Sequence, residues 1–231
     1  MKYRDLFFDL DHTLWDFNAN AKNTLLQLYE RLNLSSVGVG DFELFYAHYM
    51  VHNEKLWSRY RNGFIKSEEL RWKRMWLTLL EFDIRNEALA RELGAGFLEL
   101  LPTRKLLFPG AVATLGFLTD KGYRLHLITN GFEATQHSKL HHSGIAHFFK
   151  EVITSEGSNS LKPQKEIFDY ALRRANALPD RSIMIGDNIE ADIQGAINAG
   201  IDQVLVNHEN IDCDIRPTYI VHSLPQLQEI F

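Results

Sequence analysis

Two aspartates near the N-terminus, Asp9 and Asp11, are the first residues whose types and spacing could do chemistry. They directly follow the apolar run Leu6-Phe7-Phe8, a pattern typical of a strand buried on both faces of a parallel sheet. Carboxylates at the carboxyl end of such a strand lie in the crevice where open α/β sheets bind ligands. Two acids in one crevice need a cation, a proton or a basic partner, because unpaired buried charge is costly.

Candidate partners follow later predicted strands, at the points where those strands end. They are Thr129-Asn130-Gly131, then Ser155-Glu156, then Lys162-Pro163 at the start of a predicted helix, and Gly186-Asp187 with Asp192 five residues on. Because the carboxyl ends of parallel strands share one edge of a sheet, we expect these groups to converge. They supply hard oxygen ligands for Mg²⁺ together with cationic and neutral donors for phosphate oxygens.

The elements that must position these residues fall into two classes. Residues 17–101 have helical periodicity and no strand pattern, which predicts four consecutive helices. From residue 109 onward helices alternate with short strands, which predicts right-handed βαβ units and a doubly wound parallel sheet. We therefore predict a Rossmann-like α/β core over residues 1–15 and 105–231, with an inserted four-helix domain over residues 16–104.

Composition narrows the class of protein. The 231 residues are 45% hydrophobic and 24% charged, as in ordinary globular proteins, and the formal net charge of −5 argues against a general nucleic-acid or anionic-membrane surface. A single cysteine, Cys213, excludes an intrachain disulfide and a cysteine-rich metal site. The chain starts almost at once in a strand pattern, and no apolar run is long enough to span a membrane. We expect a cytoplasmic protein that binds neither nucleic acid nor membrane.

The chain resembles the haloacid dehalogenase-like (HAD) hydrolase superfamily, and the resemblance covers essentially its whole length. The four motifs of that family are matched in order by Asp9-Leu10-Asp11-His12-Thr13, Thr129-Asn130-Gly131, Lys162-Pro163 and Gly186-Asp187-Asn188-Ile189-Glu190-Ala191-Asp192. The helical insertion after the first motif resembles a C1-type cap. Each motif alone is weak, but four in the correct order with a cap-sized insertion are specific. The overall pattern is most similar to the pyrimidine 5′-nucleotidase group.

The resemblance implies roles in catalysis. Asp9 would be the nucleophile that attacks phosphorus in line and forms an aspartyl-phosphate. Asp11 would be the general acid for the leaving oxygen and then the general base for the hydrolytic water. Thr129, Asn130 and Lys162 would bind the transferring phosphoryl oxygens.

The resemblance also implies a cofactor and a substrate class. Mg²⁺ would be held by Asp9, the carbonyl of Asp11, and Asp187. Asp192 and Glu156 would orient Lys162 or the metal-bound waters without contacting the metal themselves. The expected partner is a small phosphorylated metabolite, either a nucleoside monophosphate or a sugar phosphate.

The second aspartate separates the chemistries of the family. Dehalogenases attack carbon, release halide and lack a carboxylate acid at the position of Asp11, whereas an alkoxide leaving phosphorus needs a proton. We therefore predict a phosphatase, preferably a 5′-nucleotidase, with a phosphoglycolate- or sugar-phosphate-type phosphatase as the alternative. A β-phosphoglucomutase-like phosphotransferase and a non-catalytic HAD-fold binding protein are less favoured, the latter because it would need neither Asp9 nor Asp11.

Several other conspicuous side chains have simpler interpretations. Trp15 or Phe17 would either stack on a base or pack at the exit into the insertion. Four histidines on and just after a predicted helix are expected to form a solvated face: His137, His141, His142 and His147. The insertion is expected to contain a tryptophan core and a solvated basic face: Trp57, Trp72 and Trp76 for the former, Arg71, Lys73 and Arg74 for the latter.

Overall fold

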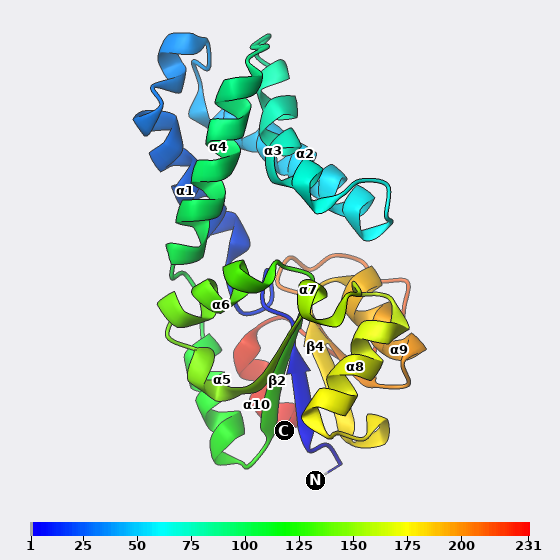
Figure 1. Ribbon diagram of the computed structural model, residues 1–231. Helices are drawn as coiled ribbons and strands as arrows, with labels where there is room; N and C mark the ends of the chain where they lie inside the picture. The colour runs from blue at the N-terminus through cyan, green and yellow to red at the C-terminus, as the bar shows by residue number, and fades with distance from the viewer. Residues whose placement is uncertain (1) are drawn as a thin grey trace. The chain divides into compact units, whose positions relative to one another are not determined.

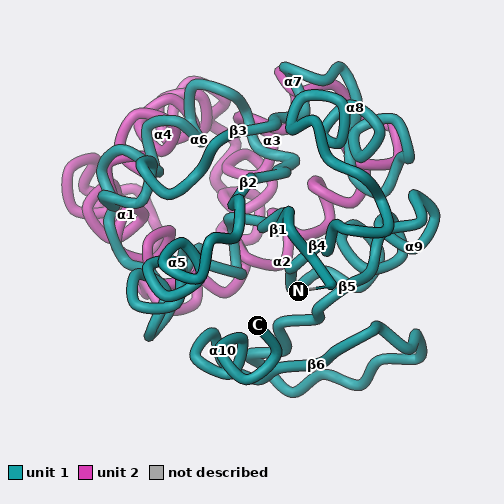
Figure 2. The backbone as a smooth tube through the Cα atoms, turned by 90° about the horizontal axis from the view of Figure 1, so that it is seen from below, with its two compact units in different colours: residues 1–17, 105–231 teal, residues 18–104 magenta. Residues whose placement is uncertain are grey.

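The computed structural model describes residues 2–231 (Figure 1). The chain divides into two compact units, one made of the segments up to Phe17 and from Lys105 onward, and the other of Asn18–Arg104 (Figure 2). The first unit contains one six-stranded parallel sheet with the order β3-β2-β1-β4-β5-β6. The predicted doubly wound α/β core is therefore confirmed. Its strands are β1 Asp5–Phe8, β2 Arg124–Thr129, β3 Phe149–Thr154, β4 Ser182–Gly186, β5 Asp202–Val206 and β6 Tyr219–Val221.

The first strand lies at the centre of the sheet, between β2 and β4. Leu6, Phe7 and Phe8 have no exposed surface, as expected for a strand covered on both faces. Phe8 pairs with Leu127 on one side and Ile185 on the other. This register brings the carboxyl ends of the three central strands to one edge, which is where Asp9 and Asp11 follow β1.

Helices cover both faces of the sheet (Figures 1 and 2). One face packs against α5 and α10, and the other against α8 and the helical segment that ends in α9. On α8 the residues Ile167, Phe168 and Ala171 are buried against Met184 of β4 and its neighbours. The helices of this unit are α5 Ala111–Asp120, α6 Glu133–His142, α7 Ser155–Ser158, α8 Lys165–Ala175, a π-helical segment Ile189–Gln194 that continues into α9 Gly195–Asn198, and α10 Leu227–Ile230.

Two helix starts in this unit have different local signals. A capping box at Ser223–Gln226 opens the last helical segment, since the Gln226 side chain accepts a hydrogen bond from the Ser223 N–H at 3.3 Å. Pro163, predicted in the first turn of a helix, instead precedes it. The helix α8 starts at Lys165, after a turn in which the Gln164 N–H donates to the Leu161 carbonyl at 2.8 Å.

The inserted segment forms four helices, as predicted. Asp41 and Asn86 cap two of them: Asp41 accepts a hydrogen bond from the Glu43 N–H at 2.8 Å, and Asn86 from the Leu89 N–H at 3.0 Å. The four helices are α1 Phe17–Arg31, α2 Phe42–Arg61, α3 Ser67–Leu80 and α4 Glu87–Leu100. The inserted unit also contains the short 3₁₀ segments Leu34–Val37 and Leu101–Thr103, and the first unit contains Ala146–Phe148, Pro179–Arg181 and Leu224–Gln226.

Two expectations about the interior of this helical unit were wrong. Its three tryptophans are only half-buried, and the buried side chains are Phe45, Tyr49, Leu56, Met75, Leu79 and Phe97 among others. Arg74 was expected on a solvated face but is only 3% exposed. Its guanidinium donates to Asn53 at 2.9 Å and lies 4.9 Å from the ring centre of Phe97, so amide and aromatic contacts replace water around the charge.

Across residues 2–231, helices are either too short or too polar to cross a bilayer.

Candidate active site

A buried lysine organises the carboxyl edge of the sheet. Lys162 is 2% exposed. Its ammonium donates hydrogen bonds to Asp9 at 2.5 Å and to the Ile128 carbonyl at 2.8 Å, and it forms an ion pair with Asp192 at 2.6 Å. Burial opposes this charge, but Asp192 and Asp9 outweigh it and raise the pKa of Lys162 above its usual value. The lysine is therefore a permanent cation against Asp9.

The backbone of this lysine is fixed by Asn130. The Asn130 side-chain amide donates to the Lys162 carbonyl at 2.9 Å and accepts from the Lys162 N–H at 2.7 Å. Both ends of the amide are thus used to dock the segment 162–163 against the end of β2. The Asn130 side chain, predicted to bind phosphate, is engaged in holding Lys162.

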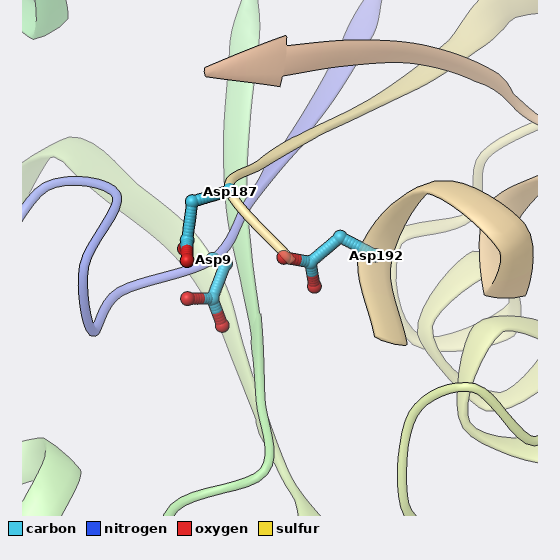
Figure 3. A group of neighbouring side chains, drawn as sticks. All are labelled: Asp9, Asp187 and Asp192. Carbon is cyan, nitrogen blue, oxygen red and sulfur yellow. The ribbon is translucent and has the colours of Figure 1, made fainter. Parts of the chain in front are cut away.

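Asp187 and Asp192 approach Asp9 from the segment after β4. Asp187 accepts a hydrogen bond from the Thr13 hydroxyl at 2.7 Å, and the second oxygen of Asp192 accepts from the Asn188 N–H at 3.0 Å. One carboxylate oxygen from each aspartate lies within 4.8 Å of the others (Figure 3). The predicted convergence of Asp9, Asp187, Asp192 and Lys162 is what the folded chain contains.

Crowding of these acids alters their ionisation. Burial raises the pKa of Asp9 well above its usual range, and Asp192 and Asp187 add to that effect while Lys162 opposes it. Burial, followed by the charge of Asp192, raises the pKa of Asp187 to about 7. Three carboxylates against one ammonium leave a formal charge of −2 in this cluster.

The donor set of this cluster fits a divalent metal ion. Carboxylate oxygens are hard ligands of the kind that Mg²⁺ prefers, and a charge of +2 would neutralise the cluster. Asp192 has both oxygens engaged, one with Lys162 and one with the Asn188 N–H, which leaves Asp9 and Asp187 as the better placed carboxylate ligands.

Asp11 has a separate set of partners. Both of its carboxylate oxygens accept hydrogen bonds from the Lys139 ammonium, at 2.6 and 2.8 Å, and one also accepts from Gln136 at 2.9 Å. Burial works against ionisation here, but Lys139 and Gln136 outweigh it and lower the pKa of Asp11. The two aspartates, only two residues apart, therefore have pKa values shifted in opposite directions.

Thr129 lies at the end of β2 and is buried. Its hydroxyl oxygen accepts hydrogen bonds from the Gly131 N–H at 3.1 Å and from Gln136 at 2.6 Å. A hydroxyl has two acceptor positions and one proton, so with both acceptor positions in use its proton is left to donate. This arrangement suits Thr129 to bind an anionic oxygen.

Glu156, the remaining predicted site residue, is exposed on α7. Its carboxylate accepts a hydrogen bond at 2.7 Å from the N–H of Glu133, the first residue of α6. An acid at this position stabilises the amino end of that helix. The four histidines predicted to be solvated are all exposed.

Trp15 and Phe17 are buried, and their rings pack beside the Lys139 ammonium. Trp15 is fully buried, and the Lys139 ammonium lies 4.4 Å from the Trp15 ring centre and 5.9 Å from that of Phe17. Of the two readings of Trp15, the structure supports packing, with a cation–π contact to the lysine.

Sequence reasoning missed three residues of this site: Thr13, Gln136 and Lys139. Thr13 belongs to the first motif but was given no role of its own in the predicted site. Gln136 and Lys139 are three residues apart on α6, which puts both on one helix face. That spacing, directly after Thr129-Asn130-Gly131, was the available signal.

Comparison with known proteins gives consistent matches. The family described as haloacid dehalogenase-like hydrolase matches residues 4–200. Pyrimidine 5′-nucleotidase YjjG of Escherichia coli is 33% identical over 236 residues, covering 100% of this chain and 98% of that protein. Glyceraldehyde 3-phosphate phosphatase of Methanothermobacter thermautotrophicus is 41% identical over 130 residues, covering 53% and 58% of the two chains. The crystal structure of YfnB from Bacillus subtilis bound to magnesium has a TM-score of 0.90 at 30% identity, covering 100% of this chain and 99% of that one.

Proposed function

The chain belongs to the haloacid dehalogenase-like hydrolases, and we propose that within this family it is a Mg²⁺-dependent phosphomonoester hydrolase acting through an aspartyl-phosphate on Asp9. The observation that carries the proposal is the pair of separately partnered carboxylates after β1, Asp9 against Lys162 and Asp11 against Lys139. A halide leaves carbon without a proton, whereas an alkoxide leaving phosphorus needs one. A second carboxylate beside the nucleophile therefore supports phosphate-ester chemistry.

The reaction has two steps in which bonds and protons balance. In the first, which requires Asp11 in its protonated form, an Asp9 oxygen attacks phosphorus, the ester P–O bond breaks, and the leaving oxygen takes the proton of Asp11. In the second, water attacks the phosphorus of the aspartyl-phosphate and gives a proton to Asp11, so that inorganic phosphate leaves and Asp9 is regenerated.

The other residues bind and orient the reacting groups. Lys162 neutralises charge on the phosphoryl group and holds the Asp9 carboxylate at 2.5 Å, while Asp192 keeps the lysine in place. The Thr129 hydroxyl, whose proton is left to donate, binds a transferring oxygen. Asn130 acts indirectly, through its two hydrogen bonds to the Lys162 backbone.

Asp9, Asp187 and the carbonyl of Asp11 would hold the Mg²⁺ ion. The chemistry that a bound Mg²⁺ supplies is neutralisation of charge between these carboxylates and the phosphoryl oxygens. Thr13 orients Asp187 for this purpose through the 2.7 Å hydrogen bond.

For the substrate we propose a nucleoside monophosphate, preferably of a pyrimidine. The support is the full-length similarity to a pyrimidine 5′-nucleotidase. The second candidate is a small phosphorylated sugar, because the glyceraldehyde 3-phosphate phosphatase is more similar to this chain but over only about half of it.

One variant tests the mechanism. Asp9→Asn should abolish phosphate release with Mg²⁺ while thermal unfolding remains cooperative. Asp169→Asn, which changes an exposed acid on α8 that pairs with Lys165, should keep wild-type activity. Full activity of the Asp9 variant would overturn the proposed mechanism.

A substrate panel tests the specificity. Phosphate release with Mg²⁺ would be compared for UMP, dUMP, dTMP, AMP, glyceraldehyde 3-phosphate, phosphoglycolate and glucose 6-phosphate. A preference for nucleotides of less than about tenfold in kcat/KM, or roughly 1.4 kcal/mol, would withdraw the nucleotidase proposal and leave the phosphatase proposal standing.

A further inference from the structure

The inner face of α6 carries two polar side chains that the four family motifs do not include. Gln136 has no exposed surface and Lys139 is 3% exposed. Burying an amide and an ammonium costs free energy unless hydrogen bonds and an opposite charge compensate. The partners of both side chains should therefore indicate why they are buried.

Lys139 is enclosed by Asp11 and two aromatic rings. Its ammonium contacts both oxygens of the Asp11 carboxylate, at 2.6 and 2.8 Å. The rings of Trp15 and Phe17 lie 4.4 and 5.9 Å from it. A two-oxygen contact restricts rotation of the carboxylate about its own axis, which a single hydrogen bond would not.

Gln136 connects Asp11 to Thr129. Its side-chain nitrogen donates to an Asp11 oxygen at 2.9 Å and to the Thr129 hydroxyl at 2.6 Å, which uses both amide hydrogens. The Gln136 side-chain oxygen is buried without a hydrogen-bond partner, and the nitrogen is assigned toward Asp11 because two oxygens without a proton between them repel when Asp11 is ionised. The two acceptors belong to different strand ends, one after β1 and one at the end of β2.

Gly131 is what allows Gln136 to reach this position. A Cβ atom on Gly131 would collide with the Gln136 side-chain amide. The motif Thr129-Asn130-Gly131 thus contributes three separate features: a hydroxyl, an amide that holds Lys162, and the space through which Gln136 passes.

We propose that Gln136 and Lys139 are positioning residues that hold the Asp11 carboxylate at a fixed place and orientation relative to the Thr129 hydroxyl. The inference rests on the function proposed above, in which Asp11 transfers protons and Thr129 binds a phosphoryl oxygen. When Asp11 is held in place relative to Thr129, the carboxyl that protonates the leaving oxygen is aligned with the hydroxyl that binds a phosphoryl oxygen of the same substrate.

The proposal predicts which kinetic constants depend on Lys139. The ester-breaking step needs a proton from Asp11 only if the leaving oxygen is basic. Phenolate is more basic than p-nitrophenolate, so cleavage of a phenyl ester depends more strongly on proton donation by Asp11. Hydrolysis of the aspartyl-phosphate needs Asp11 as a base whatever the original ester was. Loss of Lys139 should therefore affect kcat/KM in an ester-dependent way and kcat for both esters.

The experiment compares Lys139→Met with wild type on p-nitrophenyl phosphate and phenyl phosphate, two esters of similar shape. On phenyl phosphate, kcat/KM should fall about tenfold or more, since general acid catalysis is typically worth ~10²–10⁴. On p-nitrophenyl phosphate, kcat/KM should stay within about threefold of wild type, while kcat and KM fall together. A burst of p-nitrophenol should appear as well, because hydrolysis of the aspartyl-phosphate has become the slow step.

Three further variants complete the experiment: a rescue, a second test and a control. Lys139→Arg keeps a cation and should recover part of the loss, and Gln136→Met, which removes both amide donors, should give the same ester-dependent pattern. His137→Met changes an exposed residue of the same helix and should behave as wild type. Thermal unfolding of each variant identifies any that do not fold, and the remaining variants then decide the question.

The possible outcomes separate this inference from the proposed function. An equal loss of kcat/KM on both esters, or no loss on either, overturns the positioning role when wild type is active and Asp9→Asn is not. If wild type releases no phosphate from any ester with Mg²⁺, the proposed function fails, and this inference fails with it. An ester-dependent loss with the burst supports both.

Discussion

Removing the Lys162 ammonium should destabilise the protein strongly and in a pH-dependent way. In Lys162→Met, the carboxylates of Asp9 and Asp192 stay buried but lose the cation that lies 2.5 and 2.6 Å away. Breaking one buried pair by removing a single partner costs about 3–5 kcal/mol, because an uncompensated charge remains. We expect a loss of about that size in the free energy of unfolding at pH 7.5, measured by urea denaturation in EDTA.

The sign of the pH effect follows from which state binds protons. Without Lys162 the buried Asp9 carboxylate loses the cation that opposes its desolvation, so its pKa in the folded state should rise further above that in the unfolded state. The folded variant then binds protons as the pH falls, and its stability rises relative to wild type. The difference in unfolding free energy between the variant and wild type should therefore shrink between pH 7.5 and pH 5.5.

The matched control is Lys165→Met, three residues on in the chain. Lys165 pairs with Asp169 at 2.6 Å on the exposed surface of α8, and exposed pairs of this spacing contribute only about 0.3–0.5 kcal/mol. A Lys162 variant that lost less than about 1 kcal/mol, or lost the same amount at both pH values, would refute the idea that this lysine compensates buried negative charge.

Two further perturbations test other parts of the site. Burial raises the pKa of Asp187 to about 7, above its value in the unfolded chain, so the metal-free protein should become more stable as the pH falls from 8 to 6. Thermal unfolding in EDTA should show this rise in stability. The rise should disappear when saturating Mg²⁺ replaces EDTA, and also in Asp187→Asn. An unchanged slope in Asp187→Asn would contradict that assignment. Gly131→Ala should displace Gln136 and reproduce the ester-dependent kinetics of Gln136→Met, with a stability cost of about 1–3 kcal/mol from overpacking. Its control is Gly116→Ala, in the interior of α5 with open space around the position, which should be neutral or stabilise by up to about 1 kcal/mol in urea denaturation.

Most of the architecture could be predicted from local pattern. A fully apolar run such as Leu6-Phe7-Phe8 has few alternatives to a central parallel strand, and glycines mark the ends of the following helices. The convergence of Asp9, Lys162 and Asp187 then follows from the geometry of a parallel sheet, whose strand ends share one edge. Sequence order and sheet topology together were sufficient for this half of the site.

The partners of Asp11 could not be predicted in the same way. The helix α6 exposes its histidines and buries Gln136, Lys139 and Leu140, so two of its three inward residues are polar. Hydropathy indicates the buried face of a helix only when that face is apolar, and here it identified only the solvated face that carries the histidines. Arg74 was misjudged for the same reason, since its burial depends on Asn53 and Phe97, on two other helices.

The difference between the two aspartates is a property of the fold rather than of the residues. Asp9 and Asp11 are chemically identical and lie two positions apart, yet one belongs to a cluster with a formal charge of −2 and the other to a neutral pair with Lys139. These surroundings raise the pKa of Asp9 and lower that of Asp11. The proposed roles need Asp9 ionised and Asp11 protonated, the reverse of these directions, so bound metal and substrate must change both ionisation states. A divalent ion would compensate the first cluster but has no excess charge to compensate at the second. On this argument, metal removal should impair the attack by Asp9 directly, whereas loss of Lys139 should impair proton transfer by Asp11, and the two defects should be kinetically distinct.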